Sequence, residues 1–142
     1  MDFSSFSIDS IEEELPIILL KEYKLSSHVR GYHAYMTIWE PKNGEFLETR
    51  LESENELDKY AVAVIKNSVV VGHLAKGKTG RFAKTISFFL RASNDNSCKV
   101  EVTGKRVNLG DGYGLQIPCN LHFTGHVNFI NKLKEILPPL MQ

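Results

Sequence analysis

An amide and a carboxylate precede an apolar strand in the stretch NELDKYAVAV, which covers residues 55–64. Asn55 and Asp58 stand in its polar half, and the apolar run follows Tyr60. An Asp before a strand is typical of a turn, because its side chain bonds to the backbone two residues further on. The same carboxylate could also accept a hydrogen bond from a ligand. Both interpretations of Asp58 are consistent with this stretch alone.

A second polar group follows in VGHLAKGKTGR, residues 71–81. His73 ends an expected strand, and Lys76, Lys78 and Arg81 stand among glycines before an expected helix. Basic side chains and free amides at a helix start suit the phosphates of a nucleic-acid backbone. A solvated basic helix start would give the same pattern. Because cations at a helix N-terminus oppose its dipole, their clustering favours a functional explanation.

Aromatic side chains are the second requirement for binding a single strand, since each stacked base contributes ~1–3 kcal/mol. Five of them lie on expected strands or loops: Tyr32, Tyr35, Trp39, Tyr60 and Tyr113. Strand alternation places Tyr35 on the face of His33, and Trp39 opposite Tyr32. Tyr113 stands in a glycine-rich loop that leads into a strand, whereas phosphate loops lead into a helix. Some of these rings must belong to the core.

Catalysis and metal binding are both disfavoured by the sequence. Asp58 and His73 could form an acid–base pair, but no activated nucleophile accompanies them. Cys119, His122 and His126 have metal-like spacing, yet a structural zinc needs four ligands and no second Cys/His pair is present. Alternation also sends Cys119 and His122 to opposite faces of a strand. We therefore expect a non-catalytic protein without metal or cofactor.

The composition is that of an ordinary globular domain. The 142 residues are 42% hydrophobic and 24% charged, which fits one domain with a sizeable core. The net charge is zero, but residues 1–60 hold 6 Lys/Arg against 13 Asp/Glu and residues 61–142 hold 11 against 4. This asymmetry indicates a basic face, unless the fold interleaves the two halves.

Nothing in the sequence indicates secretion or membrane insertion. The N-terminus has no basic start followed by an apolar core, and no apolar run reaches the ~18 residues of a membrane span. The two cysteines, Cys98 and Cys119, do not form a C-x-x-C motif. We expect an intracellular protein with reduced thiols and no membrane contact.

Two parts are expected along the chain. Residues 1–26 are interpreted as an N-terminal arm, with a short amphipathic helix that Pro16 ends and an apolar strand or extended segment at residues 17–20. This arm could pack on the body of the protein, bind a protein partner or mediate self-association. Residues 27–142 form the body of the chain.

The body has β texture. Strands are expected at residues 28–39, 46–51, 60–66, 69–74, 99–106 and 115–123, with a tight hairpin at Asn67 and Ser68. A helix is expected at residues 81–91, and a C-terminal helix begins near Thr124 and contains Val127 and Leu137. Because strands and helices do not alternate, the pattern predicts a mainly β fold, a small antiparallel barrel of about six strands with two helices.

Four blocks of residues resemble the HIRAN domain. They are Val29-x-Gly31-x-x-x-Tyr35, Asn55-x-x-Asp58-Lys59-x-Ala61-Val62-x-Val64, Val71-Gly72-His73-Leu74-x-Lys76, and Leu115-x-Ile117-Pro118 followed by Phe123-x-Gly125. The resemblance covers roughly residues 28–137 and keeps the order of the family's blocks. It implies an OB-like antiparallel barrel of the kind found at the N-terminus of SWI/SNF-type remodelling helicases.

The resemblance also implies a ligand, the free 3′-hydroxyl end of single-stranded DNA. By position, Asn55 and Asp58 would read the terminal hydroxyl and the end nucleotide. His73 and Lys76 would contact phosphates, and His33 would replace a basic residue with the same role. A nuclear protein that acts in DNA repair is the corresponding expectation. A carboxylate suits a 3′-OH because it repels a 3′-phosphate.

The sequence departs from the family at its stacking positions. Ala34, Leu57 and Leu115 stand where end-binding members have aromatic residues. Tyr32, Tyr60 or Tyr113 could substitute from neighbouring positions. The alternative is a protein-interaction or assembly module that keeps the barrel without binding DNA ends, with residues 1–20 as the contact segment.

Overall fold

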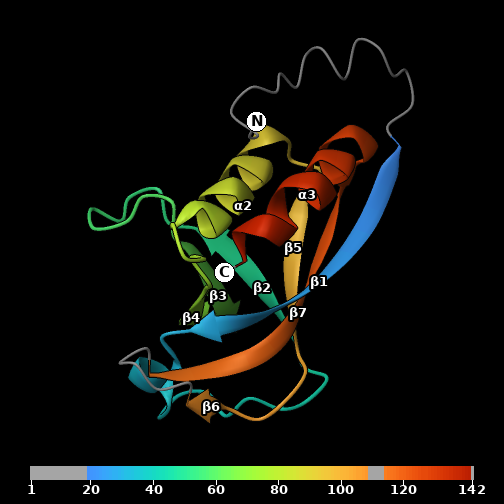
Figure 1. The fold of residues 1–142 in the computed structure, drawn as a ribbon. Coiled ribbons are helices and arrows are strands. Elements are labelled where there is room, and N and C mark those ends of the chain that lie inside the picture. The colour runs from blue at the N-terminus through green and yellow to red at the C-terminus, as the bar shows by residue number, and fades with distance from the viewer. Residues whose placement is uncertain (1–18, 109–113, 142) are drawn as a thin grey trace.

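The computed structural model describes residues 19–108 and 114–141, and of His33 it describes the backbone alone. These residues form a closed antiparallel barrel of six strands with one additional strand and two α-helices (Figure 1). The barrel strands are β1 (Leu20–Arg30), β2 (Phe46–Leu51), β3 (Val62–Lys66), β4 (Val69–Leu74), β5 (Ser97–Val102) and β7 (Leu115–His126). The predicted fold class, a mainly β protein built on a small antiparallel barrel, is confirmed.

The barrel closes through its first strand. The strands follow one another in the order β1-β4-β3-β2-β5-β7, and β1 pairs again with β7. The short strand β6 (Val107–Asn108) pairs only with β7, beyond the closed ring. Closure leaves the ring without the unpaired strand edges that would invite association with another chain.

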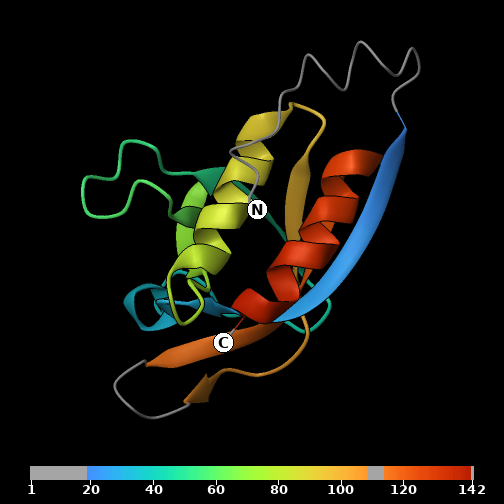
Figure 2. The ribbon, with the colours of Figure 1, turned by 45° about the horizontal axis from the view of Figure 1, so that its top comes forward.

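Both helices cover the same part of the barrel. α2 (Arg81–Ala92) and α3 (Val127–Leu140) lie side by side, whereas β6 lies at the other end (Figures 1 and 2). Each helix buries one stripe of apolar residues, among them Phe82, Ile86 and Phe89 of α2 and Phe129, Ile130, Leu133 and Leu137 of α3. The ring of Phe89 packs edge-on against Phe123 of β7, with centroids 5.8 Å apart. These contacts fix α2 against the barrel wall.

The first barrel strand begins earlier than the sequence indicated. β1 starts at Leu20 and pairs with β7 from Leu20↔His126 to Val29↔Ile117. Residues 20–26, which were interpreted as part of the N-terminal arm, are therefore one wall of the barrel. Their polar residues hid an alternation in which Tyr23 and Leu25 pack against the core. Residues 1–18, which carry the rest of the expected arm, lie outside the described residues.

The expected strand at residues 28–39 is wrong in its second half. β1 ends at Arg30, Gly31 has a positive φ of 79°, and the 3-10 helix η2 (Tyr32–Tyr35) follows. Only glycine adopts such a φ without a steric cost, so Gly31 permits the change of direction. The faces assigned to the aromatic residues by strand alternation therefore do not apply.

The hairpin between β3 and β4 is confirmed. Asn67 and Ser68 both have positive φ, 51° and 67°, which is the backbone pattern of a type I′ turn.

Some element boundaries differ from those predicted: β5 ends at Val102 rather than at residue 106, and β7 extends to His126. The N-cap of α3 is His126, not Thr124. Among the helices of the described residues, none has the length and apolarity to cross a membrane.

Candidate functional site

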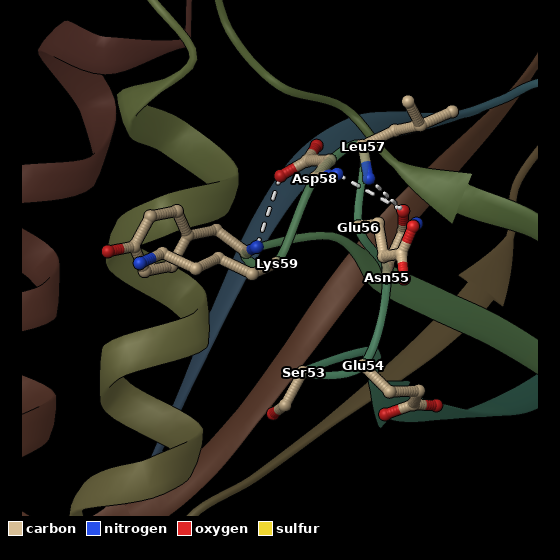
Figure 3. A pocket seen from close by; sticks show the side chains of 8 residues that line it. Ser53, Glu54, Asn55, Glu56, Leu57, Asp58 and Lys59 are labelled. Atoms are coloured by element: carbon tan, nitrogen blue, oxygen red, sulfur yellow. Dashed lines mark hydrogen bonds between the residues drawn. The ribbon is translucent and has the colours of Figure 1, made fainter.

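The loop between β2 and β3 is organised by its own side chains. The Oδ1 atom of Asn55 accepts hydrogen bonds from the backbone amides of Leu57 and Asp58, at 3.0 and 3.1 Å (Figure 3). The Oδ1 atom of Asp58 accepts one from the amide of Tyr60 at 3.1 Å. Both polar residues therefore act as turn residues, as the local pattern predicted. These bonds also fix the direction of the Asp58 carboxylate.

The second oxygen of Asp58 faces two cations. Its Oδ2 lies 3.4 Å from the Nζ of Lys76 and 3.9 Å from the Nη2 of Arg30. Arg30 is held by a 2.9 Å hydrogen bond from its Nε to the carbonyl of Leu74. The carboxylate keeps a quarter of its side-chain surface exposed. Asp58 is thus a partly open acceptor between two positive charges.

A second carboxylate links the predicted residues to one another. The Oε1 of Glu52 lies 2.6 Å from the Nε2 of His73 and accepts a 3.4 Å hydrogen bond from the Nδ2 of Asn55. His73 is the cross-strand partner of Arg30 in the pairing of β1 with β4. The structure therefore brings Asn55, Asp58, His73 and Lys76 together at one end of the barrel. The sequence analysis did not identify Arg30 or Glu52.

Two hollows flank this loop. One, of about 450 Å³, lies between the loop and the start of α2 and is lined by Leu57, Asp58, Tyr60, Lys76, Thr79, Gly80, Arg81, Ala83 and Lys84. The other, of about 510 Å³, is formed by residues 53–60 (Figure 3). Leu57, Asp58 and Tyr60 line both hollows. The hollow beside α2 joins a carboxylate to three cationic side chains, a composition suited to a sugar–phosphate ligand.

The backbone amides at the start of α2 were expected to be free, but they have hydrogen-bond acceptors within the protein. The carbonyl of Lys76 accepts hydrogen bonds from the amides of Phe82 and Ala83, and the Thr79 hydroxyl accepts a 3.4 Å bond from that of Arg81. These donors are therefore not free to bind a phosphate, as the sequence had indicated. Lys78 and Arg81 are exposed and form no ion pair within the described residues. Side-chain charge, rather than free amides, is what this helix start offers.

The predicted stacking residues have different fates. Tyr32 is 2% exposed and donates its hydroxyl to the carbonyl of Trp39, so it is a core residue rather than a stacking platform. Tyr35 is half-buried against the core, and Tyr113 lies outside the described residues. Of His33, only the backbone in η2 is described. Tyr60 is half-buried and lines both hollows together with Asp58.

The structure also describes the three positions at which the family has aromatic residues and this chain does not. Leu57 is 99% exposed at the tip of the loop, where its side chain points away from Asn55 and Asp58 (Figure 3). Ala34 is exposed, and Leu115 is half-buried against the core. Leu57 therefore offers an apolar surface beside the polar group, but no ring.

The Cys/His motif of β7 does not converge. Cys119 is 1% exposed, whereas His122 lies on the outer face with its Nε2 2.7 Å from the Oε1 of Glu101. His126 caps α3 by accepting a hydrogen bond from the amide of Asn128. The opposite orientation of Cys119 and His122 is as alternation predicted. Within residues 19–108 and 114–141, no three His, Cys, Asp or Glu side chains gather as metal ligands would.

Comparison with known proteins identifies the fold. No protein-family model and no curated protein sequence matches the chain. Among solved structures, the crystal structure of the HIRAN domain of human HLTF matches with a TM-score of 0.61 and 21% sequence identity, over 82% of this chain and 87% of that one. A structure of a Lactobacillus plantarum protein gives 0.49 at 18% identity, over 76% of this chain and 100% of that one, too low to argue a shared fold. The chain has the fold of a HIRAN-like domain.

Proposed function

We propose that this domain is a non-catalytic module that binds single-stranded DNA at a 3′-hydroxyl end. The observation that carries the proposal is the position of the Asp58 carboxylate, 3.4 Å from Lys76 and 3.9 Å from Arg30 at the edge of an open hollow. An acceptor for a hydroxyl and donors for a phosphate are thereby combined within the span of one nucleotide.

The chemistry of this group favours a terminus over the middle of a strand. A terminal 3′-OH can donate a hydrogen bond to Asp58, whereas a 3′-phosphate brings negative charge toward the carboxylate. Lys76 and Arg30 then face the phosphate on the 5′ side of the terminal sugar. His73 and Asn55, both bonded to Glu52, complete the polar surface.

The resemblance of the sequence to the HIRAN family also supports this proposal. This resemblance implies binding of a 3′ end, with Asp58 as the acidic residue that contacts the terminal hydroxyl. The module would then act on DNA ends in the nucleus, in a repair process. Tyr60 and Leu57, rather than Tyr32, supply the apolar contact in this arrangement.

A titration with fluorescent oligothymidylates tests the proposal. The full chain is titrated with strands that end in a 3′-OH or a 3′-phosphate, at low salt because phosphate contacts weaken as salt rises. We expect the 3′-OH strand to bind at least about tenfold more tightly, the effect of one charge-assisted hydrogen bond. Equal affinity for the two strands, or no binding to either, would refute end recognition.

The second candidate function is a protein-interaction module, and the exposure of Leu57 favours it. The side chain of Leu57 is 99% exposed at a loop tip, so it is an apolar contact available to a protein partner. Light scattering of the full chain at rising concentration would report self-association, with Leu57→Ser as the matched variant. A monomer with measurable DNA affinity would count against this second function.

A truncation that probes the N-terminal segment should remove no more than residues 1–18, because β1 begins at Leu20.

A further inference from the structure

Tyr60 is surrounded by cations. The Nζ of Lys84 lies 4.9 Å from the centre of its ring, the Nζ of Lys59 lies 5.3 Å away, and the guanidinium carbon of Arg91 lies 5.7 Å away. Phe88 packs edge-on against the same ring at 5.5 Å. These five side chains, which we call the Tyr60 cluster, join the β2–β3 loop to the outer surface of α2.

Hydrogen bonds hold the Tyr60 cluster in place, and its charged side chains are all positive. The Nη2 of Arg91 donates to the hydroxyl of Ser53 at 3.1 Å and to the carbonyl of Lys59 at 3.0 Å, which fixes the guanidinium beside the loop. Within the part of the chain that the structure describes, none of the three cations forms an ion pair with a carboxylate. Three like charges around one ring repel one another, so an anion bound there would relieve the repulsion.

The cluster adjoins the proposed end-binding group. The amide of Tyr60 donates to the carboxylate of Asp58, so the two residues are held in one turn. Lys84 and Tyr60 line the same hollow as Asp58 and Lys76. A strand that ends at Asp58 can therefore continue over Tyr60 along α2 without leaving the surface of the domain.

We propose that the Tyr60 cluster is a second nucleotide subsite, which binds the nucleotide on the 5′ side of the terminal one. The inference rests on the proposed function and extends it by assigning a path to the strand. The base stacks on the ring of Tyr60 and displaces the ammonium of Lys84, which then contacts the adjacent phosphate beside the fixed guanidinium of Arg91. A stacked base contributes more than an exposed cation–π contact, so the exchange is favourable.

The subsite would compensate for the residues that depart from the family. Leu57 and Ala34 provide no ring, and Tyr32 is buried. Tyr60 provides one next to α2, where the cations Lys84 and Arg91 lie.

The salt dependence of binding tests the charges of this subsite. Each phosphate contact to a single strand contributes about 0.7 to the slope of log K against log salt concentration. Because Lys84 and Arg91 contact one phosphate in this subsite, the double variant Lys84→Gln/Arg91→Gln should lower the slope for a 3′-OH oligothymidylate by about 0.7, with unchanged preference for 3′-OH over 3′-phosphate. The control is Lys105→Gln/Arg106→Gln, which removes the same charge between β5 and β6, away from α2 (Figure 1). The control should leave the slope close to that of the original chain.

Variants of Tyr60 test the stacking. Tyr60→Ala should weaken binding of the oligothymidylate about 5- to 150-fold, and Tyr60→Phe, which keeps the ring, should bind within a few-fold of the original. Circular dichroism shows whether each variant is folded. An unchanged slope in the Lys84/Arg91 variant, or equal affinity of the Ala and Phe variants, would overturn the subsite.

The two proposals fail in different ways. If the original chain shows no preference for the 3′-OH strand, end recognition is refuted. If the Lys84/Arg91 variant nevertheless has a reduced salt slope, the subsite is retained as a contact for internal nucleotides. A clear 3′-OH preference with an unchanged slope would refute the subsite alone. Absence of any binding by the original chain would refute both.

Discussion

The Nε2 atom of His73 lies 2.6 Å from the Oε1 atom of Glu52, which connects the end of β4 to the loop that carries Asp58. The same Glu52 oxygen accepts a hydrogen bond from Asn55. Glu52 is only 17% exposed and is less accessible to a ligand than Asp58. It positions two of the side chains to which we assign DNA contacts.

Replacing Glu52 tests this positioning role. Glu52→Ala removes the acceptor of both bonds and should lower the free energy of unfolding by about 1 kcal/mol, the net value of such hydrogen bonds. It should also weaken oligonucleotide binding several-fold, because His73 and Asn55 lose their orientation. Glu52→Gln keeps an acceptor oxygen, so its losses of stability and of oligonucleotide affinity should both be smaller. Urea denaturation and the fluorescence titration measure the two effects, and equal losses in Ala and Gln variants would argue against positioning.

Gly72 allows β1 and β4 to approach each other beside the site. A Cβ atom at this position would lie 2.5 Å from Cγ1 of Val29 and 3.2 Å from the carbonyl oxygen of Arg30. Gly72→Ala should therefore destabilise the domain by about 1–3 kcal/mol, the cost of overpacking. Gly104→Ala is the matched control, because its Cβ would meet only Pro118 at an ordinary 3.6 Å. Urea denaturation that gives similar stabilities for the two variants would contradict the close approach.

The β3–β4 hairpin offers a stabilising substitution. Ser68 has a φ of 67°, a conformation that is unfavourable for residues with a Cβ. Ser68→Gly should raise the free energy of unfolding by about 1 kcal/mol, since Asn-Gly is the preferred pair in a type I′ turn. Ser68→Ala removes the hydroxyl but keeps the Cβ, and it should give no gain. A stabilisation by alanine equal to that by glycine would assign the effect to the hydroxyl instead.

The two thiols should be unreactive in the folded protein. Cys98 and Cys119 are 2% and 1% exposed, and burial raises the pKa of the Cys119 thiol to about 12. Because the thiolate is the nucleophile, a thiol with this pKa stays protonated and inert at about pH 8. A disulfide reagent should label neither cysteine at that pH until denaturant is added, when both react. Rapid labelling of the native chain would place a thiol at the surface.

Local patterns were sufficient for much of the fold. The bounds of β2 and β4 were predicted correctly, because each strand is flanked by polar turn residues. The start of α2 at Arg81 was also correct, since apolar spacing and glycines marked it. β1 was missed at residues 21–26 because the charged residues Lys21, Glu22 and Lys24 interrupt its apolar pattern, and only pairing with β7 makes it a strand.

The site depended on long-range pairing that local patterns do not contain. Asn55 and Asp58 could be identified as turn residues, and the family resemblance grouped them with His73. Arg30 reaches Asp58 only because β1 pairs with β4 in the register Arg30↔His73. The burial of Tyr32 likewise follows from the turn at Gly31, which a strand pattern does not reveal.

Asp58 is the residue on which the proposed end recognition depends most directly. Its removal has two opposing effects, because it deletes the acceptor for a 3′-OH and also frees Lys76 and Arg30 from their ion pairs. The second effect strengthens phosphate binding for every strand. A comparison that cancels the second effect is therefore needed.

The decisive measurement is a thermodynamic cycle over Asp58 and the terminal hydroxyl. The original chain and Asp58→Ala are each titrated with oligothymidylates that end in a 3′-OH or in a dideoxynucleotide. We predict that the original chain prefers the 3′-OH strand by about 1.5–3 kcal/mol, the value of a hydrogen bond to a charged group, and that Asp58→Ala abolishes the preference. An equal preference in both proteins, or none in the original chain, would contradict recognition of the 3′ end by Asp58.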